Sequence, residues 1–405
     1  MKTRPFVAMI LTVVTLFPIT ALTQQSQQPI KYFGYAGADN DEALNRVSSY
    51  TNFSYIGGSY GIPITTQVTA IKNHGMRAVI DLGDVLWCRD DPNNGYGTWH
   101  LCSESRGDLG YIARWNAWTS MNSSVLNSSN ILAFSIITEQ TLRAIPVADI
   151  QAATSLVKQR YPDISTMAID SSQEVYDAYY GFYGGSFSFP SNLDWVGVFK
   201  YYTHPNLDLR FKDSISILKL RKQSSQRIVY VMDGFYSDLH TSIAPTIMDM
   251  DQIAQEWYLV ASQDPEAILF GVFLWPDIPA ENATGSANFH PIALNKQVAI
   301  GSAILAGRVP TYQGAHDYIN CGMVMTSGWA LDASVPNTPV SVDLVVDNQF
   351  VGTQRADHYR GDVGSHGFVF YLFPYRDGRT HQVAIRYSGT TTLLPGSPKS
   401  FLCSL

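Results

Sequence analysis

The chain has 405 residues, with 27 lysines and arginines against 34 aspartates and glutamates, and a formal net charge of −7. This acidic balance argues against nucleic acid or an anionic membrane surface as a partner. The chain is longer than one typical core needs, and aromatic residues reach 12%. We therefore expect a globular protein of two domains, with many rings that can stack on flat ligands.

Residues 1–23 have the pattern of an export signal. Lys2 and Arg4 precede an uncharged apolar stretch over residues 5–20, and a polar run begins at Gln24. This order is typical of a cleaved signal peptide, so we expect a secreted protein, extracellular or periplasmic, that does not associate with the membrane after cleavage. A membrane anchor is the alternative, although the apolar stretch is short and Pro18 interrupts it.

Strand-like and helix-like runs then alternate from residue 30 to residue 308. Strands are expected at Tyr32–Gly34, Phe53–Ile56, Arg77–Leu82, Ile131–Ile137, Thr166–Ile169, Trp195–Phe199, Arg227–Met232 and Ile268–Leu274. Apolar residues at helical spacing follow most of these strands, most clearly between Ile253 and Ala261. Eight such units predict an α/β fold, a (β/α)8 TIM barrel.

One unit of this series is irregular. The segment Tyr176–Phe189 is aromatic and rich in glycine, so we expect a long loop in place of a helix after the fifth strand. An open, doubly wound sheet is the structural alternative to the barrel.

The pattern changes after Pro310. Apolar residues alternate with partners at 340–346, 368–372 and 383–387, with turn residues between them, and this predicts an all-β sandwich domain over residues 314–405. The run Gly328-Trp329-Ala330-Leu331-Asp332 resembles a Gly-Trp-Ala-x-Asp signature of small β-domains in secreted bacterial proteins. We expect this domain to be an accessory, either a spacer or a weak binding module.

The four cysteines fall into two groups. Because an even count in an exported chain suggests disulfides, we expect Cys88–Cys102 and Cys321–Cys403, each pair within one domain. The nine histidines are scattered and no Cys/His cluster has zinc spacing, so we expect neither a metal nor a cofactor.

In a barrel of this type the active site lies where the strands end at their carboxyl side. Glu139 follows the buried strand 131–137, and Asp233 follows the strand 227–232 across the barrel. Glycoside hydrolysis needs two carboxyl groups that face one bond, which makes Glu139 a candidate acid/base and Asp233 a candidate nucleophile or base. The alternative for Glu139 is a structural ion pair with a nearby cation such as Arg143.

Aromatic and acidic side chains at other strand ends indicate a sugar ligand, because rings stack on the apolar faces of sugars and polar groups bind their hydroxyls. The candidate substrate-binding residues are Tyr35, Asp81, Trp87, Tyr201, Tyr202, Trp275 and Asp277. We expect a monomer that has a carbohydrate as its partner.

The barrel, with Glu139 at the end of its fourth strand, resembles the large superfamily of (β/α)8 glycoside hydrolases. The resemblance implies an acid/base Glu ending strand four and a nucleophilic Glu ending strand seven. The chain departs from that pattern twice: Thr138 stands where the family has Asn, and Asp233 stands where it has Glu.

Two other functions stay open. The departures at Thr138 and Asp233 are compatible with a non-catalytic barrel that binds a carbohydrate or a surface. The run Gly57-Gly58-Ser59-Tyr60-Gly61 fits the pattern of a serine-esterase elbow with Ser59 as nucleophile, but that elbow needs a helix that begins at the serine.

Overall fold

The computed structural model describes residues 29–90, 98–181, 188–205, 207–237, 246–279, 282–288 and 291–403. The expected export signal lies outside these residues. Within the described ranges, no helix has the length and the apolar character needed to cross a bilayer.

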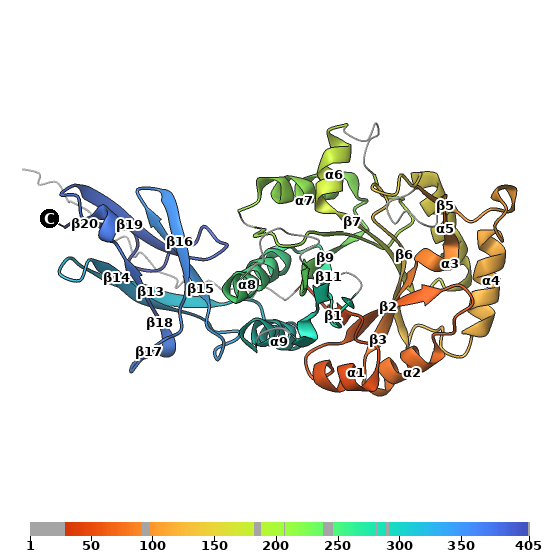
Figure 1. Ribbon diagram of the computed structural model, residues 1–405, viewed down its shortest axis with the longest axis horizontal. Helices are drawn as coiled ribbons and strands as arrows, with labels where there is room; N and C mark the ends of the chain where they lie inside the picture. The colour runs from red at the N-terminus through yellow and green to blue at the C-terminus, as the bar shows by residue number, and fades with distance from the viewer. Residues whose placement is uncertain are drawn as a thin grey trace, which may run out of the picture.

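Eight parallel strands close into a barrel in the order β1-β11-β9-β8-β7-β6-β3-β2 (Figure 1). They are β1 (Tyr32–Ala36), β2 (Phe53–Ser59), β3 (Arg77–Leu82), β6 (Ile131–Thr138), β7 (Ser165–Ser171), β8 (Trp195–Phe199), β9 (Arg227–Asp233) and β11 (Ala267–Phe273). Closure occurs between β1 and β11, where Tyr32 lies opposite Leu269. The expected (β/α)8 barrel is confirmed, and the open doubly wound sheet is wrong.

Helices follow the strands and cover the outside of the barrel (Figure 1). They are α1 (Asp41–Val47), α2 (Thr65–Asn73), α3 (Gly83–Leu86), α4 (Tyr111–Met121), α5 (Val147–Arg160), α6 (Ser172–Tyr179), α7 (Leu209–Arg221), α8 (Ile247–Gln263) and α9 (Pro291–Leu305). The expectation of a loop without a helix after the fifth strand is wrong. There α6 begins at Ser172, and it buries Val175 and Ala178 although Tyr176 and Tyr179 also belong to this short helix.

Two short antiparallel strand pairs extend the loops after the barrel strands. One pairs β4 (Trp87–Arg89) with β5 (Trp99–Leu101), and the other pairs β10 (Tyr236–Ser237) with β12 (Ala283–Thr284).

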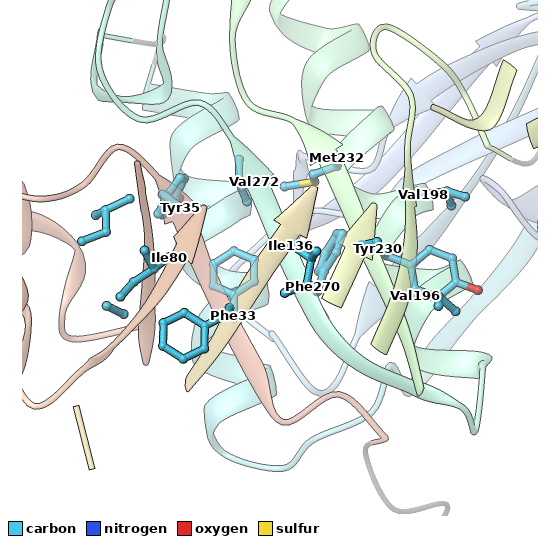
Figure 2. Packing of buried hydrophobic residues seen from close by; sticks show 14 of the residues in the cluster. Phe33, Tyr35, Ile80, Ile136, Val196, Val198, Tyr230, Met232, Phe270 and Val272 are labelled. Atoms are coloured by element: carbon cyan, nitrogen blue, oxygen red, sulfur yellow. The ribbon is translucent and has the colours of Figure 1, made fainter. Parts of the chain in front are cut away.

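Alternation along each strand divides the apolar side chains into two layers. One layer fills the barrel interior and includes Val79, Ala133 and Val229. The other lies between the strands and the helices, and Figure 2 shows part of it, including Phe33, Tyr35, Ile136 and Phe270. Strand β6 contributes to both layers and is buried along nearly all of its length, as its unbroken apolar sequence predicts.

The C-terminal region forms two four-stranded antiparallel sheets around a separate apolar core, which confirms the β-sandwich. One sheet has the order β13 (Tyr312–Asn320), β14 (Met325–Asp332), β18 (Gly364–Tyr371) and β17 (His358–Arg360). The other has the order β16 (Gln349–Arg355), β15 (Ser341–Val346), β19 (Thr380–Tyr387) and β20 (Lys399–Leu402).

Both expected disulfides are present. Cys88 and Cys102 join β4 to the residue after β5, with a Cα–Cα distance of 5.0 Å. Cys321 and Cys403 join the end of β13 to the residue after β20, with a Cα–Cα distance of 5.3 Å. The second bond closes a loop over most of the sandwich, and in the chain-entropy model it stabilises that domain by about 4–5 kcal/mol.

Helices α8 and α9 lie between the barrel and the sandwich (Figure 1). Several of their contacts with the sandwich are polar and buried. Gln255 accepts a hydrogen bond from the Ser341 N–H at 2.8 Å, and the Lys296 ammonium donates to the Pro339 carbonyl at 2.7 Å. The same ammonium lies 3.7 Å from the carboxylate of Asp251, a residue that is 0% exposed. The interface therefore keeps charged groups away from water.

Replacing Lys296 by Met should destabilise the protein by at most about 3–5 kcal/mol, because the substitution leaves the buried Asp251 with Arg355, at 3.9 Å, as its remaining described cation. Urea unfolding followed by tryptophan fluorescence measures the loss. Lys212→Met, on the exposed side of α7, is the matched control. Equal unfolding midpoints for the two variants would contradict the assigned role of Lys296.

Candidate active site in the barrel mouth

A cavity of about 550 Å³ opens at the carboxyl ends of the barrel strands. Much of its wall is apolar and comes from the ends of β1, β8 and β11 and from deeper residues of the interior. Its polar wall consists of Tyr55, Asp81, Thr138, Glu139, Arg143 and Tyr201. Within the described part of this wall, Asp81 and Glu139 are the two carboxyl groups and Arg143 is the cation.

Glu139 sits at the first position after β6, as the strand-end rule predicts. Its backbone has a φ of 57°, in the left-handed region that a glutamate seldom adopts. Two hydrogen bonds hold that conformation: the Glu139 N–H donates to the Ile169 carbonyl at 2.9 Å, and the Glu139 carbonyl accepts from the Arg143 N–H at 3.0 Å. Unusual backbone of this kind, held by its surroundings, is found preferentially at functional sites.

The Glu139 side chain is ion-paired. Arg143 places a guanidinium nitrogen 2.8 Å from one carboxylate oxygen and also donates to the Thr138 carbonyl at 3.0 Å. The guanidinium carbon lies 4.0 Å from the ring centre of Trp99, a cation–π distance. The ion pair considered for Glu139 from sequence is therefore present. The Trp99 ring stacks against the Arg143 guanidinium and helps to hold it in position.

Asp81 approaches the cavity from β3, the strand beside β6. The Tyr55 hydroxyl donates to one of its oxygens at 2.7 Å, and the Gly83 N–H donates to the other at 2.7 Å. Burial raises the pKa of Asp81, while these two hydrogen bonds act in the opposite direction. Asp81 is therefore a partly buried carboxyl group with neutral donors.

Behind the Glu139 turn lies a second pair of carboxyl groups. Asp170, which is 0% exposed, accepts a hydrogen bond from the Thr141 hydroxyl at 2.6 Å and another from the Ser171 N–H at 3.1 Å. Glu174 lies beside it on α6, and burial, followed by the charge of Asp170, raises the pKa of Glu174 to about 9. The pair therefore retains a proton at neutral pH while Asp170 anchors the middle of the turn.

Asp233 ends β9, but it does not contribute to the described wall of the cavity. Its side chain is 1% exposed, and burial raises its pKa to about 7. The neighbouring Tyr202 has a φ of 53°, and its hydroxyl accepts a hydrogen bond from the Ser237 N–H at 2.8 Å. The structure thus places the two carboxyl groups singled out from sequence in different environments: Glu139 at the cavity and Asp233 buried.

Of the seven predicted substrate-binding residues, two line the cavity and five do not. Asp81 and Tyr201 line the cavity, and the Tyr201 ring stacks on Phe273 with a centroid distance of 5.6 Å. The other five, which are not part of the described cavity wall, are Tyr35, Trp87, Tyr202, Trp275 and Asp277.

Three of these five are buried aromatic side chains. Tyr35 bonds Gln297 of α9 at 2.9 Å and meets Trp275 edge to face, and Trp87 donates to the Ile136 carbonyl at 2.8 Å. Asp277 instead organises its own loop by accepting from the Gly285 N–H at 2.8 Å and from Asn288 at 2.6 Å.

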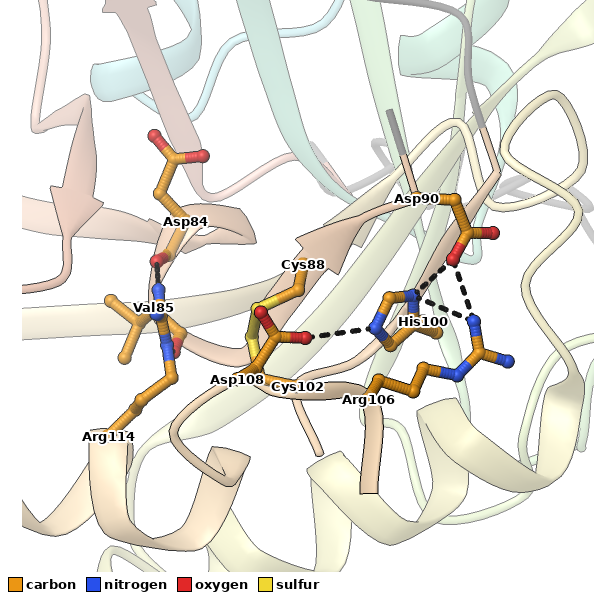
Figure 3. The surroundings of a disulfide bond; sticks show 9 residues. All are labelled: Asp84, Val85, Cys88, Asp90, His100, Cys102, Arg106, Asp108 and Arg114. Atoms are coloured by element: carbon orange, nitrogen blue, oxygen red, sulfur yellow. Dashed lines mark hydrogen bonds and ion pairs between the residues drawn. A yellow bond between two sulfur atoms is a disulfide. The ribbon is translucent and has the colours of Figure 1, made fainter. Parts of the chain in front are cut away.

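The Cys88–Cys102 loop forms a charged cluster beside the disulfide (Figure 3). His100 lies between Asp90 at 3.1 Å and Asp108 at 3.2 Å, and Arg106 bonds Asp90 at 2.7 Å. Arg106 and Asp108, which follow Cys102, are therefore both paired with residues of the disulfide loop.

Ser59 ends β2, and α2 begins six residues later at Thr65. No hydrogen bond between Ser59 and a histidine occurs among the residues with described positions. The helix does not begin at the serine, so the local geometry differs from an esterase elbow. Across the same residues, no group of three or more His, Cys, Asp or Glu side chains is arranged to hold a metal ion.

The Asp170–Glu174 pair predicts a pH dependence. A carboxyl group whose pKa is raised by folding stabilises the folded state below its unfolded value, near 4.3, and loses this contribution as the pH rises toward the folded value of about 9. The free energy of unfolding should therefore fall between about pH 5 and pH 9, by at most about 1.4 kcal/mol per pH unit for each proton, and Asp233, whose pKa is raised to about 7, adds to the slope below that pH.

Glu174→Gln should flatten this slope, because an amide cannot titrate yet can still donate to Asp170. Guanidinium unfolding at pH 5, 7 and 9 measures the slope, with Glu42→Gln on the exposed face of α1 as control. Identical slopes for the wild type and Glu174→Gln would refute the assignment.

Comparison with protein-family models gives no match, and comparison with curated proteins gives none either. Among solved structures, the chain is similar to a GH10 xylanase from Thermobacillus composti, with a TM-score of 0.40 and 10% identity over 61% of this chain and 84% of that one. It is also similar to endo-glycoceramidase II from Rhodococcus sp. in a cellobiose-like isofagomine complex, with a TM-score of 0.40 and 12% identity over 84% and 96% of the two chains. A mutant of xylanase 10C from Cellvibrio japonicus in complex with xylopentaose has a TM-score of 0.37 and 11% identity over 60% and 57%.

Proposed function

We propose that this protein acts on a carbohydrate in the barrel mouth as a secreted glycoside hydrolase, with Glu139 as one of its two carboxyl groups. The observation that carries the proposal is the cavity at the carboxyl ends of the strands, with Asp81 and Glu139 in its wall. Barrels of this class place their chemistry at that face, and hydrolysis of a glycosidic bond requires two carboxyl groups at one cavity.

The composition of the wall supports a sugar as ligand. Tyr201 offers an aromatic face, and the stacked Phe273 behind it extends the apolar side of the cavity. Asp81 and Arg143 supply an acceptor and a multiple donor for hydroxyl groups. A cavity of about 550 Å³ lies within the range of small-molecule sites. The two disulfides support an oxidising, extracellular or periplasmic location.

A second candidate function is carbohydrate binding without hydrolysis. The ion pair between Glu139 and Arg143 favours it, because a carboxylate bonded to a guanidinium at 2.8 Å is already engaged. The burial of Asp233 also favours it, since the strand-seven carboxyl group expected opposite Glu139 is 1% exposed. In this reading Glu139 and Arg143 together bind sugar hydroxyls, and the sandwich remains an accessory domain.

The two functions separate in one experiment. The protein is tested on a panel of plant, bacterial and glycolipid oligosaccharides, for release of reducing ends and for binding by calorimetry. Glu139→Gln should lower turnover by at least ~10²-fold while binding persists, because the amide keeps the shape of the side chain but cannot transfer a proton.

Glu104→Gln, which replaces an exposed acid shortly after Cys102, serves as the control for that substitution. Unchanged turnover in Glu139→Gln would rule out its role in hydrolysis. Binding without release by the wild type would select the second function.

A further inference from the structure

The described cavity wall contains a second carboxyl group besides Glu139, that of Asp81 on the neighbouring strand β3. Strands β3 and β6 pair in the barrel, with Asp81 opposite Ser135. Val79, two residues before Asp81, belongs to the interior cluster, so Asp81 points to the same side and reaches the cavity. Asp81 and Glu139 thus enter the cavity from adjacent strands, whereas Asp233 is buried off the described wall.

The partners of the two carboxyl groups differ in charge. Glu139 has a guanidinium at 2.8 Å, which matches a negative carboxylate. Asp81 has a phenol and a backbone N–H, both neutral and both at 2.7 Å. Burial raises the pKa of Asp81 and outweighs the hydrogen bonds from Tyr55 and Gly83 and the charge of Arg143, which act in the opposite direction. Glu139 thus faces a cation, while Asp81 is more deeply enclosed and faces neutral groups alone, and an acid and a base commonly occupy two such different environments.

We propose that Asp81 is the proton donor to the leaving oxygen of a glycoside and that Glu139 is the base that activates water. This assignment rests on the proposed hydrolytic function. The bond between the anomeric carbon and the leaving oxygen breaks, and its electron pair stays with that oxygen, which takes the proton of Asp81. A water oxygen bonds to the anomeric carbon and gives its proton to Glu139, and exchange with solvent then restores both groups.

Leaving groups of different quality test this role. The probes are 2,4-dinitrophenyl and phenyl glycosides of glucose, galactose, xylose, cellobiose and lactose, because dinitrophenolate departs without a proton and phenolate needs one. Asp81→Asn should lower kcat/KM on the phenyl glycosides by ~10²-fold or more, and its effect on the dinitrophenyl glycosides should be at least tenfold smaller. Asp163→Asn, which removes an exposed carboxyl group in the turn after α5, is the matched control.

A second variant keeps the carboxyl group and changes its surroundings. Tyr55→Phe removes the hydroxyl that donates to Asp81, and because that hydrogen bond lowers the pKa of Asp81, its loss should raise the pKa. A proton donor must be protonated to act, so the basic limb of kcat/KM against pH should move to higher pH in Tyr55→Phe and disappear in Asp81→Asn. Thermal unfolding of each variant reports whether the fold is kept.

The outcomes separate the assignment from the function that it extends. If the wild type releases no phenol from any probe, hydrolysis itself fails, and the assignment of Asp81 fails with it. If the wild type is active and Asp81→Asn loses equal activity on both leaving groups, or loses none, the assignment of Asp81 alone is overturned. It is overturned as well if Asp233→Asn, and not Asp81→Asn, shows the dependence on the leaving group.

Discussion

Closure of eight parallel strands into a barrel satisfies the backbone of every strand on both sides and leaves no edge. Side chains must then alternate between a sealed interior and a layer under the helices. Val79, Ala133 and Val229 fill that interior, so polar side chains can reach a ligand only where the strands end. The cavity with Asp81 and Glu139 in its wall follows from this constraint.

The turn that carries Glu139 is supported from three directions. Hydrogen bonds to the backbone fix its left-handed conformation, Trp99 lies against the guanidinium of Arg143, and Asp170 accepts the hydroxyl of Thr141 from below. Ile169 and Asp170 are consecutive residues of β7, and Trp99 belongs to β5. A carboxyl group held in this way keeps its position when a ligand enters, which is the preorganisation that either binding or catalysis requires.

Much of the architecture could be predicted from the sequence, because strand and helix periods are local and strong in most units. Helix α6 was not expected, since tyrosines and a following glycine-rich run mask its short buried face, Val175 and Ala178. The disulfide pairs were expected because the cysteines fall into two groups, and both are confirmed.

The site was less predictable. The strand-end rule tells which residues lie at the carboxyl end of the barrel, but not whether their side chains point into the cavity or toward the helices. Tyr35 lies between Gly34 and Ala36, which both line the cavity, yet its own ring packs outward against α9. Counting the alternation along β1 would have excluded it. The hydrogen bond between Thr141 and Asp170 joins residues 29 positions apart, and no local sequence pattern predicts it.

The polar interface between the domains has a consequence for how the molecule is divided. Lys296 and Gln255 belong to barrel helices, yet Pro339 and Ser341 of the sandwich complete their hydrogen bonding. On the side of α8 and α9, polar groups of the barrel therefore depend on the sandwich for hydrogen bonds. A chain that ended near residue 310 would expose Lys296 and its buried partner Asp251 to solvent. The sandwich therefore covers one side of the barrel, and the two domains share buried hydrogen bonds that neither completes alone.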